Sequence, residues 1–233
     1  MRNVIEFYGL SGCGKTTTSE HLISLLRAKG YTVGTQDDFI HSRLSYSKKY
    51  KYFLYLIYVI LSLTKPGNIK LFHVFFKISN DDSITKKIKR SLYAYRFYIA
   101  YIKKNKYDYI VLEQGFIQAI ISLFHTESEF DESLLQIIKE VMTKKSICVY
   151  CEADTDIVIR RITGRKTTGG RFDLYTDCEN LYRDLEILQR NFAIIDNQLS
   201  IDLMCYIKLN MEISAECNAE IVMYQISKGD CKD

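Results

Sequence analysis

The chain has 233 residues, 47% of them hydrophobic and 26% charged, and its formal net charge is +4. These values are ordinary for a globular chain, and the length suits a single domain, residues 1–233, with an inserted subdomain. The seven cysteines have no framework spacing, which argues against a disulfide scaffold and favours reduced thiols. Met1 leads straight into the first predicted strand, so we expect no signal peptide and a cytoplasmic protein.

Charge is distributed unevenly along the chain. Residues 39–106 contain fifteen lysines and arginines against two aspartates, so this segment carries +13 and the remainder carries −9. The same segment contains nine of the eighteen tyrosines. Two interpretations stay open: a basic surface that faces an anionic substrate, nucleic acid or membrane, or helix faces that are simply solvated.

The first predicted strand and the loop after it carry the strongest signal. Val4, Ile5 and Phe7 predict a buried strand, residues 9–16 read G-x-x-x-x-G-K-T, and a helix is predicted over 15–29. A strand, this loop and a helix in succession are typical of a phosphate-binding loop. The residues expected to bind the nucleotide here are Gly9, Ser11, Gly12, Cys13, Gly14, Lys15, Thr16 and Thr17.

The residue types in this loop suit a triphosphate. Gly9, Gly12 and Gly14 can adopt positive φ and bring their N–H groups against phosphate oxygens. The N-terminus of the following helix adds the positive end of its dipole. Lys15 can reach the β- and γ-phosphates, and the Thr16 hydroxyl can ligate Mg²⁺. The loop therefore predicts binding of a nucleoside triphosphate, interpreted as ATP, together with Mg²⁺.

A second strand is predicted over Tyr31–Gln36, and it ends at Asp37 and Asp38. Acidic residues at the carboxyl end of a parallel strand lie where α/β folds bind ligands. Either carboxylate could accept a proton from an acceptor hydroxyl or orient it. Alternatively, the pair caps the helix that follows.

Residues 39–106 are predicted to form a helical insert that binds the acceptor. The stretch 50–64 is apolar nearly all round but too short to cross a bilayer, which needs roughly 20 residues. A buried helix is favoured there, with a helix on a membrane surface as the alternative. A second apolar piece covers 69–78, and the spacing of apolar residues predicts a helix over 84–104.

A third strand is predicted over Tyr107–Glu113, and its apolar run indicates burial on both faces. Glu113 ends it, at the place where phosphate-loop enzymes keep an acidic group for Mg²⁺ or for proton transfer. The alternative is a surface carboxylate at a strand end.

Helices are predicted over 115–142, a fourth strand over Ser146–Glu152, and an arginine-bearing lid over 153–178. Arginines on a closing loop can stabilise the charge on a phosphoryl group in transfer while excluding water. The alternative is a basic helix face followed by a loose loop. The arginines are Arg160, Arg161, Arg165 and Arg171.

The last part of the chain predicts three elements. Leucine, phenylalanine and isoleucine side chains at helical spacing over 181–199 predict a long amphipathic helix that packs in the core or between subunits. A fifth strand is predicted over 203–210 and a final helix over 219–226.

This layout resembles the P-loop kinases of the nucleoside and nucleotide kinase superfamily, among which thymidylate kinases are the nearest comparison. The resemblance covers most of the chain in order and rests on the phosphate loop and the run DIVIRRITGR at 156–165. It implies a three-layer α/β/α P-loop NTPase fold. Its sheet would be parallel and five-stranded, in the order 2-3-1-4-5, with a helical insert and an arginine-bearing lid.

The resemblance also implies roles for single residues. Lys15 matches the phosphate-loop lysine, and Arg161 and Arg165 match lid arginines. Arg96 ends a segment, LYAYR, similar to the one whose arginine holds the acceptor phosphate in thymidylate kinases. Asn210 would lie in the loop that packs on adenine.

A second likeness concerns the acceptor. The stretch GLSGCGKTT, followed by Asp37, Asp38 and Arg43, is similar to the start of adenylylsulfate kinases. In thymidylate kinases Asp-Arg follows the third strand, where this chain has Glu113 and Gln114. The acceptor is therefore left open, with Arg43, Arg96 and Arg171 as its candidate ligands.

The sequence thus predicts an ATP- and Mg²⁺-dependent kinase that transfers the γ-phosphoryl group to a small polar acceptor, with a nucleoside or nucleotide favoured. One alternative is a kinase that acts on a nucleic-acid end or a lipid-linked saccharide through the basic insert; another is a nucleotide-switched regulatory ATPase. A homodimer stays open, and contact with nucleic acid or membrane is not favoured. The catalytic candidates are Lys15, Asp37, Asp38, Glu113, Arg161 and Arg165, and Thr16 and Glu113 are the metal candidates.

Overall fold

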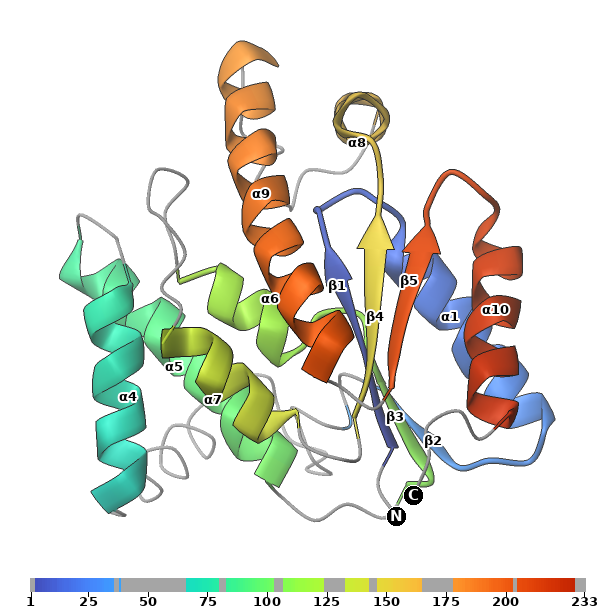
Figure 1. Cartoon of the computed structure of the whole chain (residues 1–233), viewed down its shortest axis with the longest axis horizontal. Coiled ribbons are helices and arrows are strands. Elements are labelled where there is room, and N and C mark those ends of the chain that lie inside the picture. The colour runs from blue at the N-terminus through green and yellow to red at the C-terminus, as the bar shows by residue number, and fades with distance from the viewer. Residues whose placement is uncertain are drawn as a thin grey trace, which may run out of the picture.

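The computed structural model describes residues 3–35, 38, 66–79, 83–102, 107–123, 133–142, 146–164, 178–202 and 205–228. The elements in these residues, in chain order and labelled as in Figure 1, are β1 (Asn3–Gly9), α1 (Lys15–Ala28), β2 (Val33–Gly34), α4 (Pro66–Ile78), α5 (Ile84–Ile102), β3 (Tyr109–Leu112), α6 (Phe116–Ile121), α7 (Ser133–Val141), β4 (Ser146–Glu152), α8 (Thr155–Thr163), α9 (Cys178–Asp202), β5 (Tyr206–Asn210) and α10 (Ala215–Ser227).

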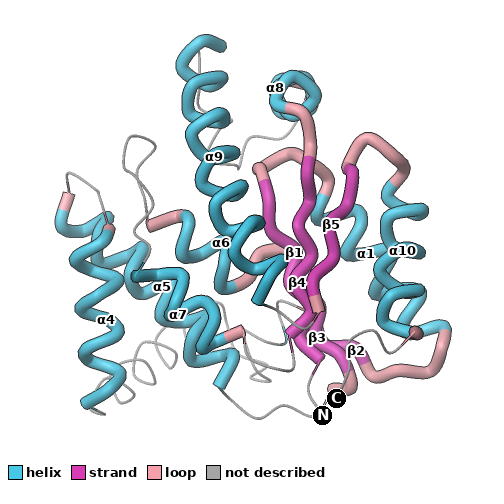
Figure 2. The backbone as a smooth tube through the Cα atoms, in the orientation of Figure 1, coloured by secondary structure: helices cyan, strands magenta, loops and turns pink. Residues whose placement is uncertain are grey.

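The five strands form one parallel sheet in the order β2-β3-β1-β4-β5, which confirms the predicted order. The strands lie side by side in Figure 2. All four residues of β3 are buried, as are five of the seven in β4, because helices cover both faces of the sheet. The carboxyl ends of parallel strands meet at one edge, so the loops after β1, β3, β4 and β5 all leave the sheet there.

Two layers of helices enclose the sheet, so the predicted three-layer α/β/α architecture is confirmed (Figure 1). Helices α1 and α10 pack on one another and cover one face. Helices α6 and α9 cover the other face, where α5 and α7 pack against α6 and α4 packs on α5. Helix α8 follows β4 at the edge where the strands end.

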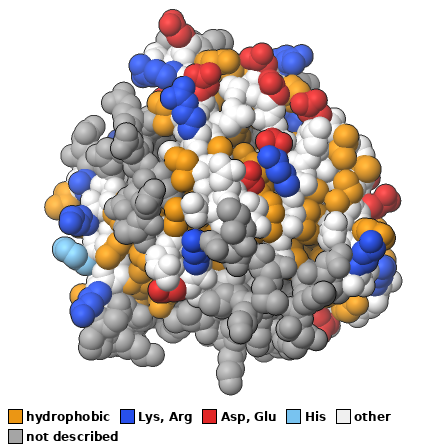
Figure 3. Space-filling model, in the orientation of Figure 1, with side chains coloured by type: hydrophobic (Ala, Val, Ile, Leu, Met, Phe, Trp, Pro, Cys, Tyr) orange, Lys and Arg blue, Asp and Glu red, His pale blue; other side chains and the backbone are white. Residues whose placement is uncertain are grey.

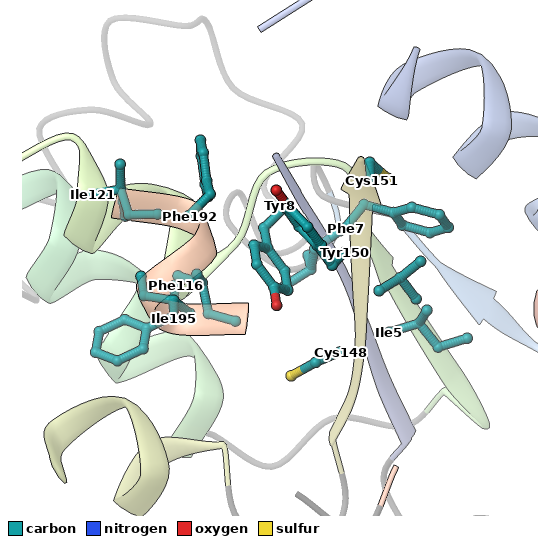
Figure 4. Packing of buried hydrophobic residues seen from close by; sticks show 14 of the residues in the cluster. Ile5, Phe7, Tyr8, Phe116, Ile121, Cys148, Tyr150, Cys151, Phe192 and Ile195 are labelled. Atoms are coloured by element: carbon teal, nitrogen blue, oxygen red, sulfur yellow. The ribbon is translucent and has the colours of Figure 1, made fainter. Parts of the chain in front are cut away.

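Alternation along β1 divides the core into two parts. Ile5 and Phe7 point to one side of the sheet, whereas Tyr8 lies on the side of α9 (Figure 4). The ring of Tyr8 stacks on that of Tyr150 in the neighbouring strand, with centroids 5.2 Å apart, and both rings lie near Phe192 of α9. All five of these side chains are buried, so aromatic packing holds α9 to the centre of the sheet.

The edge strand β2 begins later than predicted. Among the described residues 31–35 of the predicted Tyr31–Gln36, only Val33 and Gly34 pair with β3. Thr32 donates both its N–H and its hydroxyl to the Asp108 carboxylate, at 2.7 and 2.6 Å, so this N–H bonds a side chain instead of a strand. Gly34 lies against the ring of Tyr107, which leaves no space for a larger side chain.

In the predicted insert, residues 39–106, nearly all of the described residues belong to helices α4 and α5, which agrees with the helical prediction. The predicted helix at 50–64 lies outside the described residues. No helix in the described ranges is long and apolar enough to span a bilayer. Acidic and basic side chains both gather at the upper end of the face in Figure 3, where α8 and the start of α9 lie in Figure 1.

The cysteines only partly follow the prediction of reduced thiols. Cys13, Cys148 and Cys151 are free and buried, and Cys217 is free and exposed. Cys205 is disulfide-bonded, so the prediction is wrong for this residue.

Candidate nucleotide-binding site

The loop between β1 and α1 has the backbone of an anion cradle. Gly9, Gly12 and Gly14 have φ angles of 143°, 90° and 117°, values that side-chain-bearing residues rarely adopt. The N–H of Cys13 bonds the Leu10 carbonyl at 3.3 Å, which closes the turn. Glycine at these positions lets the chain reverse tightly and direct amide groups into the turn.

Helix α1 begins at Lys15 without a side-chain cap and without an acidic residue in its first turn. Gly14 stands at the N-cap, where serine, threonine, aspartate and asparagine are the usual residues. The positive end of the helix dipole is therefore not neutralised by a cap, which leaves it available to an anion. The side chains of Thr16 and Thr17 are exposed at this end.

The Lys15 ammonium lies over the loop. Its Nζ donates to the Gly9 and Leu10 carbonyls at 2.9 and 2.7 Å and lies 3.7 Å from the Cys13 sulfur. Only 7% of the residue is exposed. A buried ammonium held by neutral carbonyls lacks an anionic oxygen partner at these contacts, so a phosphate group would be a stronger partner than the carbonyls.

Arg161 of α8 joins two loops at the edge of the sheet. Its Nη1 donates to the Cys13 carbonyl at 2.5 Å, and its Nη2 donates to the Met211 carbonyl at 3.0 Å. Met211 follows β5, so one guanidinium connects the phosphate loop, the segment after β4 and the turn after β5. The nearest atoms to a side chain at Gly14 would be Met211 Cε at 3.2 Å and Arg161 Nη1 at 3.7 Å.

The turn after β5 is held by amide side chains. The Asn210 side chain accepts the Glu212 N–H at 2.9 Å, and the Asn210 carbonyl accepts from the buried Asn218 side chain at 2.9 Å. Asn218 Nδ2 also lies 3.7 Å from the Met211 sulfur. These contacts fix the backbone that Arg161 reaches.

The side chain of Glu6 in β1 is a buried carboxyl group that contacts the start of α6. Glu6 is fully buried and accepts hydrogen bonds from the Ile117 N–H at 2.6 Å and from the Tyr101 hydroxyl of α5. Burial raises its pKa from 4.5 to about 7, although Tyr101 and the amides at the start of α6 lower it. Gln118, in the same helix, accepts the Gly9 N–H at 3.3 Å, so α6 contacts the beginning of the phosphate loop.

The predicted acidic residues that the structure describes, Glu113 and Asp38, follow strands β3 and β2. Glu113 directly follows β3 and is half-buried. Asp38 is exposed, and its Oδ2 accepts from the Thr35 N–H at 3.0 Å and the Thr35 hydroxyl at 3.1 Å, a contact that suits a turn or cap. In the described ranges there is no group of three or more His, Cys, Asp or Glu side chains that could hold a metal ion by themselves.

Several predicted site residues cannot be placed. Asp37, Arg43, Arg165 and Arg171 lie outside the described residues. The backbone of Arg96 lies in α5, but its side chain is not described.

No protein-family model and no curated protein matches the chain. Among solved structures, the YorR protein from Bacillus subtilis, in complex with phosphorylated GDP, matches with a TM-score of 0.50 and 13% identity over 96% of this chain and 95% of that one. The chain shares the fold of this structure, a three-layer α/β/α P-loop fold. Two further solved structures are similar. Shikimate kinase from Bacteroides thetaiotaomicron matches with a TM-score of 0.49 and 12% identity over 97% of this chain and 98% of that one. Deoxyadenosine kinase from M. mycoides with bound dCTP matches with a TM-score of 0.47 and 15% identity over 98% of this chain and 100% of that one.

Within this fold, the structure adds residues that the sequence did not indicate. Glu6, Gln118 and Met211 were not predicted to act near the loop. Glu6 was detectable as the lone charged residue inside an apolar strand, because a buried carboxylate needs partners. Met211 contributes a backbone carbonyl, which leaves no signal in a sequence.

Proposed function

We propose that the chain is a kinase that uses ATP and Mg²⁺ to phosphorylate a small polar acceptor, with a nucleoside or nucleotide favoured. The observation that carries this proposal is the buried Lys15 ammonium, which donates to the Gly9 and Leu10 carbonyls in a glycine-rich loop at an uncapped helix N-terminus. A triphosphate would offer this ammonium anionic oxygens and would satisfy the amide groups around it.

The donor half of the reaction needs little covalent chemistry from the protein, because phosphoryl transfer is catalysed mainly by positioning and charge stabilisation. The loop amides and Lys15 would hold the β- and γ-phosphates. Arg161 has further N–H groups beyond the two that bond carbonyls, and these would stabilise charge on the phosphoryl group as it moves. Asn210 lies in the turn that would pack on adenine.

Two residues suit the Mg²⁺ that such a reaction uses. Thr16 presents a hydroxyl on the exposed first turn of α1, and Glu113 presents a carboxylate at the end of the strand beside β1. Both are hard oxygen ligands, and Mg²⁺ in kinases needs only one or two of these besides water and phosphate. A Mg²⁺ ion held by these two residues would neutralise part of the charge on the phosphates.

The acceptor half rests on fewer observations. Asp37, Asp38 or Glu113 would orient the acceptor hydroxyl or accept its proton, and Arg43, Arg96 and Arg171 would contact the acceptor. Specificity for thymidylate has no support beyond the resemblance in the sequence. YorR, whose fold the chain shares, is described with a phosphorylated guanosine nucleotide, so guanosine nucleotides belong among the acceptors to be tested.

The test is a screen for transfer of label from γ-labelled ATP to nucleosides, nucleoside monophosphates, shikimate and sugars. We expect acceptor-dependent product with the wild-type chain and none with Lys15→Ala. ATP hydrolysis of equal rate with every acceptor and without one would contradict the kinase and support a regulatory ATPase. Label transferred only to oligonucleotides or lipid-linked saccharides would replace the small acceptor by a polymer or a membrane substrate.

A further inference from the structure

Helix α4, which packs on α5 and lies far from the sheet, carries a basic face (Figure 1). Its exposed residues are Ile69, Lys70, His73 and Lys77, and helical spacing places these four on one side of the helix. The other side chains described in α4 are buried or half-buried. Basic side chains line the edge of the molecule in Figure 3 where α4 lies in Figure 1. The side of α4 that faces solvent therefore combines cations with an isoleucine.

The first turns of α5 have the same character. Only residues 79–83 connect the two helices, so this end of α5 lies close to the last turn of α4. The exposed residues here are Ile84, Thr85, Lys86, Ile88 and Lys89. The exposed side chains of α4 and of the first turns of α5 together are called the α4–α5 surface below.

The lysines of the α4–α5 surface are not paired with acidic residues in the part of the chain that the structure describes. Helices α4 and α5 contain no aspartate or glutamate. No described carboxylate forms an ion pair with any of the four exposed lysines, which are Lys70, Lys77, Lys86 and Lys89. A surface on which one sign of charge gathers attracts a partner of the opposite sign. The partner that fits this surface is therefore anionic.

The isoleucines of this surface distinguish between two anionic partners, a membrane and a nucleic acid. Ile84, Ile69 and Ile88 are 67%, 52% and 40% exposed. At a bilayer, aliphatic side chains can enter the boundary between headgroups and acyl chains while lysines contact the anionic headgroups. A single-stranded nucleic acid would instead stack its bases on exposed aromatic rings. The aromatic side chains described in α4 and α5 are all buried or half-buried, so the surface suits a membrane better.

We propose that the α4–α5 surface binds the surface of a bilayer that contains anionic phospholipids. The lysines lie at the headgroups in this contact, and the isoleucines enter the boundary beneath them. The sequence alone does not favour a membrane contact, and the structure adds the exposure of cations and isoleucines on neighbouring helices. The inference goes beyond the proposed kinase and does not depend on it, because it uses none of the residues proposed to bind the nucleotide or the acceptor.

The test is flotation of the full chain with two kinds of vesicle, phosphatidylcholine alone and phosphatidylcholine mixed with phosphatidylserine. We expect wild type to float only with the mixed vesicles, and less as NaCl is added, because salt screens exposed charges. Lys70→Ala combined with Lys77→Ala should lower the partition coefficient on the order of twentyfold, about fivefold for each lysine. The matched control combines Lys29→Ala with Lys228→Ala. It removes the same charge from exposed positions just after α1 and α10 and should float like wild type.

A third variant tests the isoleucines and separates a membrane from a nucleic acid. Ile84→Ser combined with Ile88→Ser keeps every charge and should lower the partition coefficient on the order of tenfold, because less apolar surface enters the bilayer. The same proteins are titrated with a fluorescent single-stranded oligonucleotide at equal ionic strength, and we expect no binding that depends on Lys70 and Lys77.

Three results would overturn the proposal. The first is that wild type does not float with the mixed vesicles at low salt. The second is that the two pairs of lysine variants lose flotation equally, which would assign the attraction to net charge and not to this surface. The third is that the isoleucine variant floats like wild type while the lysine pair at 70 and 77 loses oligonucleotide binding, which would assign the surface to a nucleic acid.

Discussion

At the scale of single residues, the most unusual side chain in the sheet is Glu6. It lies in the central strand, fully buried, with Tyr101 from α5, the amides of 116–118 from α6 and Cys148 from β4 around it. A carboxyl group in such a place costs free energy unless it is hydrogen-bonded. Here it gains partners from two helices, so Glu6 links α5 and α6 to the strand that leads into the phosphate loop.

The raised pKa of Glu6 makes a prediction about stability. Because its pKa rises from 4.5 in the unfolded chain to about 7 in the folded one, folding favours the protonated carboxyl. Its contribution to the free energy of unfolding is complete below pH 4.5 and is lost as pH rises to 7, by about 3 kcal/mol in total. Urea unfolding of wild type and Glu6→Gln between pH 4.5 and 8 checks this. The wild type should lose stability relative to the variant across this window, and parallel curves would contradict the prediction.

Gly115 allows the Glu6 carboxylate to reach α6. A Cβ at this position would overlap the Glu6 side chain, whereas a Cβ at Gly164 would meet only the Arg160 carbonyl, at 3.1 Å. We expect Gly115→Ala to lower the free energy of unfolding by about 2–3 kcal/mol, because the carboxylate must leave its partners. Gly164→Ala should change it by less than about 1 kcal/mol. Equal effects in chemical denaturation would mean that the Glu6 contact does not limit this position.

At the scale of elements, three segments that follow different strands meet through Arg161. The phosphate loop, helix α8 and the turn after β5 are far apart in the sequence, and one guanidinium bonds carbonyls of two of them from the third. A planar group with donors in a fixed fork can do this, and a lysine ammonium cannot bridge the same two sites with equal geometry. The phosphate loop and the proposed adenine-side turn are therefore coupled through α8.

This coupling predicts different effects for two neighbouring arginines. Arg161→Ala should raise the dissociation constant for ATP on the order of tenfold, because hydrogen bonds from a charged group position both loops. Arg161→Lys should recover only part of the loss. Arg160 is exposed and bonds the Asp156 carbonyl of its own helix, so Arg160→Ala is the matched control and should bind like wild type. Equal affinities for the two alanine variants in calorimetric titrations would rule out this bridge.

At the scale of the whole molecule, the fold was largely predictable because it depends on local patterns. The apolar runs of β1, β3 and β4 and the apolar spacing of α9 are properties of contiguous residues, and the strand order followed from the resemblance that the phosphate loop supports. The later start of β2 was not predictable, since it depends on Asp108, which is 76 positions away from Thr32 in the sequence.

The site was predictable only where its chemistry belongs to one short segment. The pattern at 9–16 identified the loop, and the arginines after β4 identified the region that reaches it. The contacts between Glu6 and Tyr101 and between Arg161 and Met211 join residues that only the folded chain brings together. No periodicity or spacing in the sequence records such pairs.

The central claim is that the loop at 9–16 binds a nucleoside triphosphate through Lys15. Calorimetric titration of MgATP into wild type, Lys15→Ala and Lys29→Ala tests it most directly, because Lys29 is an exposed lysine at the other end of α1. We predict that Lys15→Ala weakens binding roughly a hundredfold, since it removes the buried cation that would contact the phosphates, and that Lys29→Ala leaves it unchanged. Equal affinities for wild type and Lys15→Ala would contradict the claim.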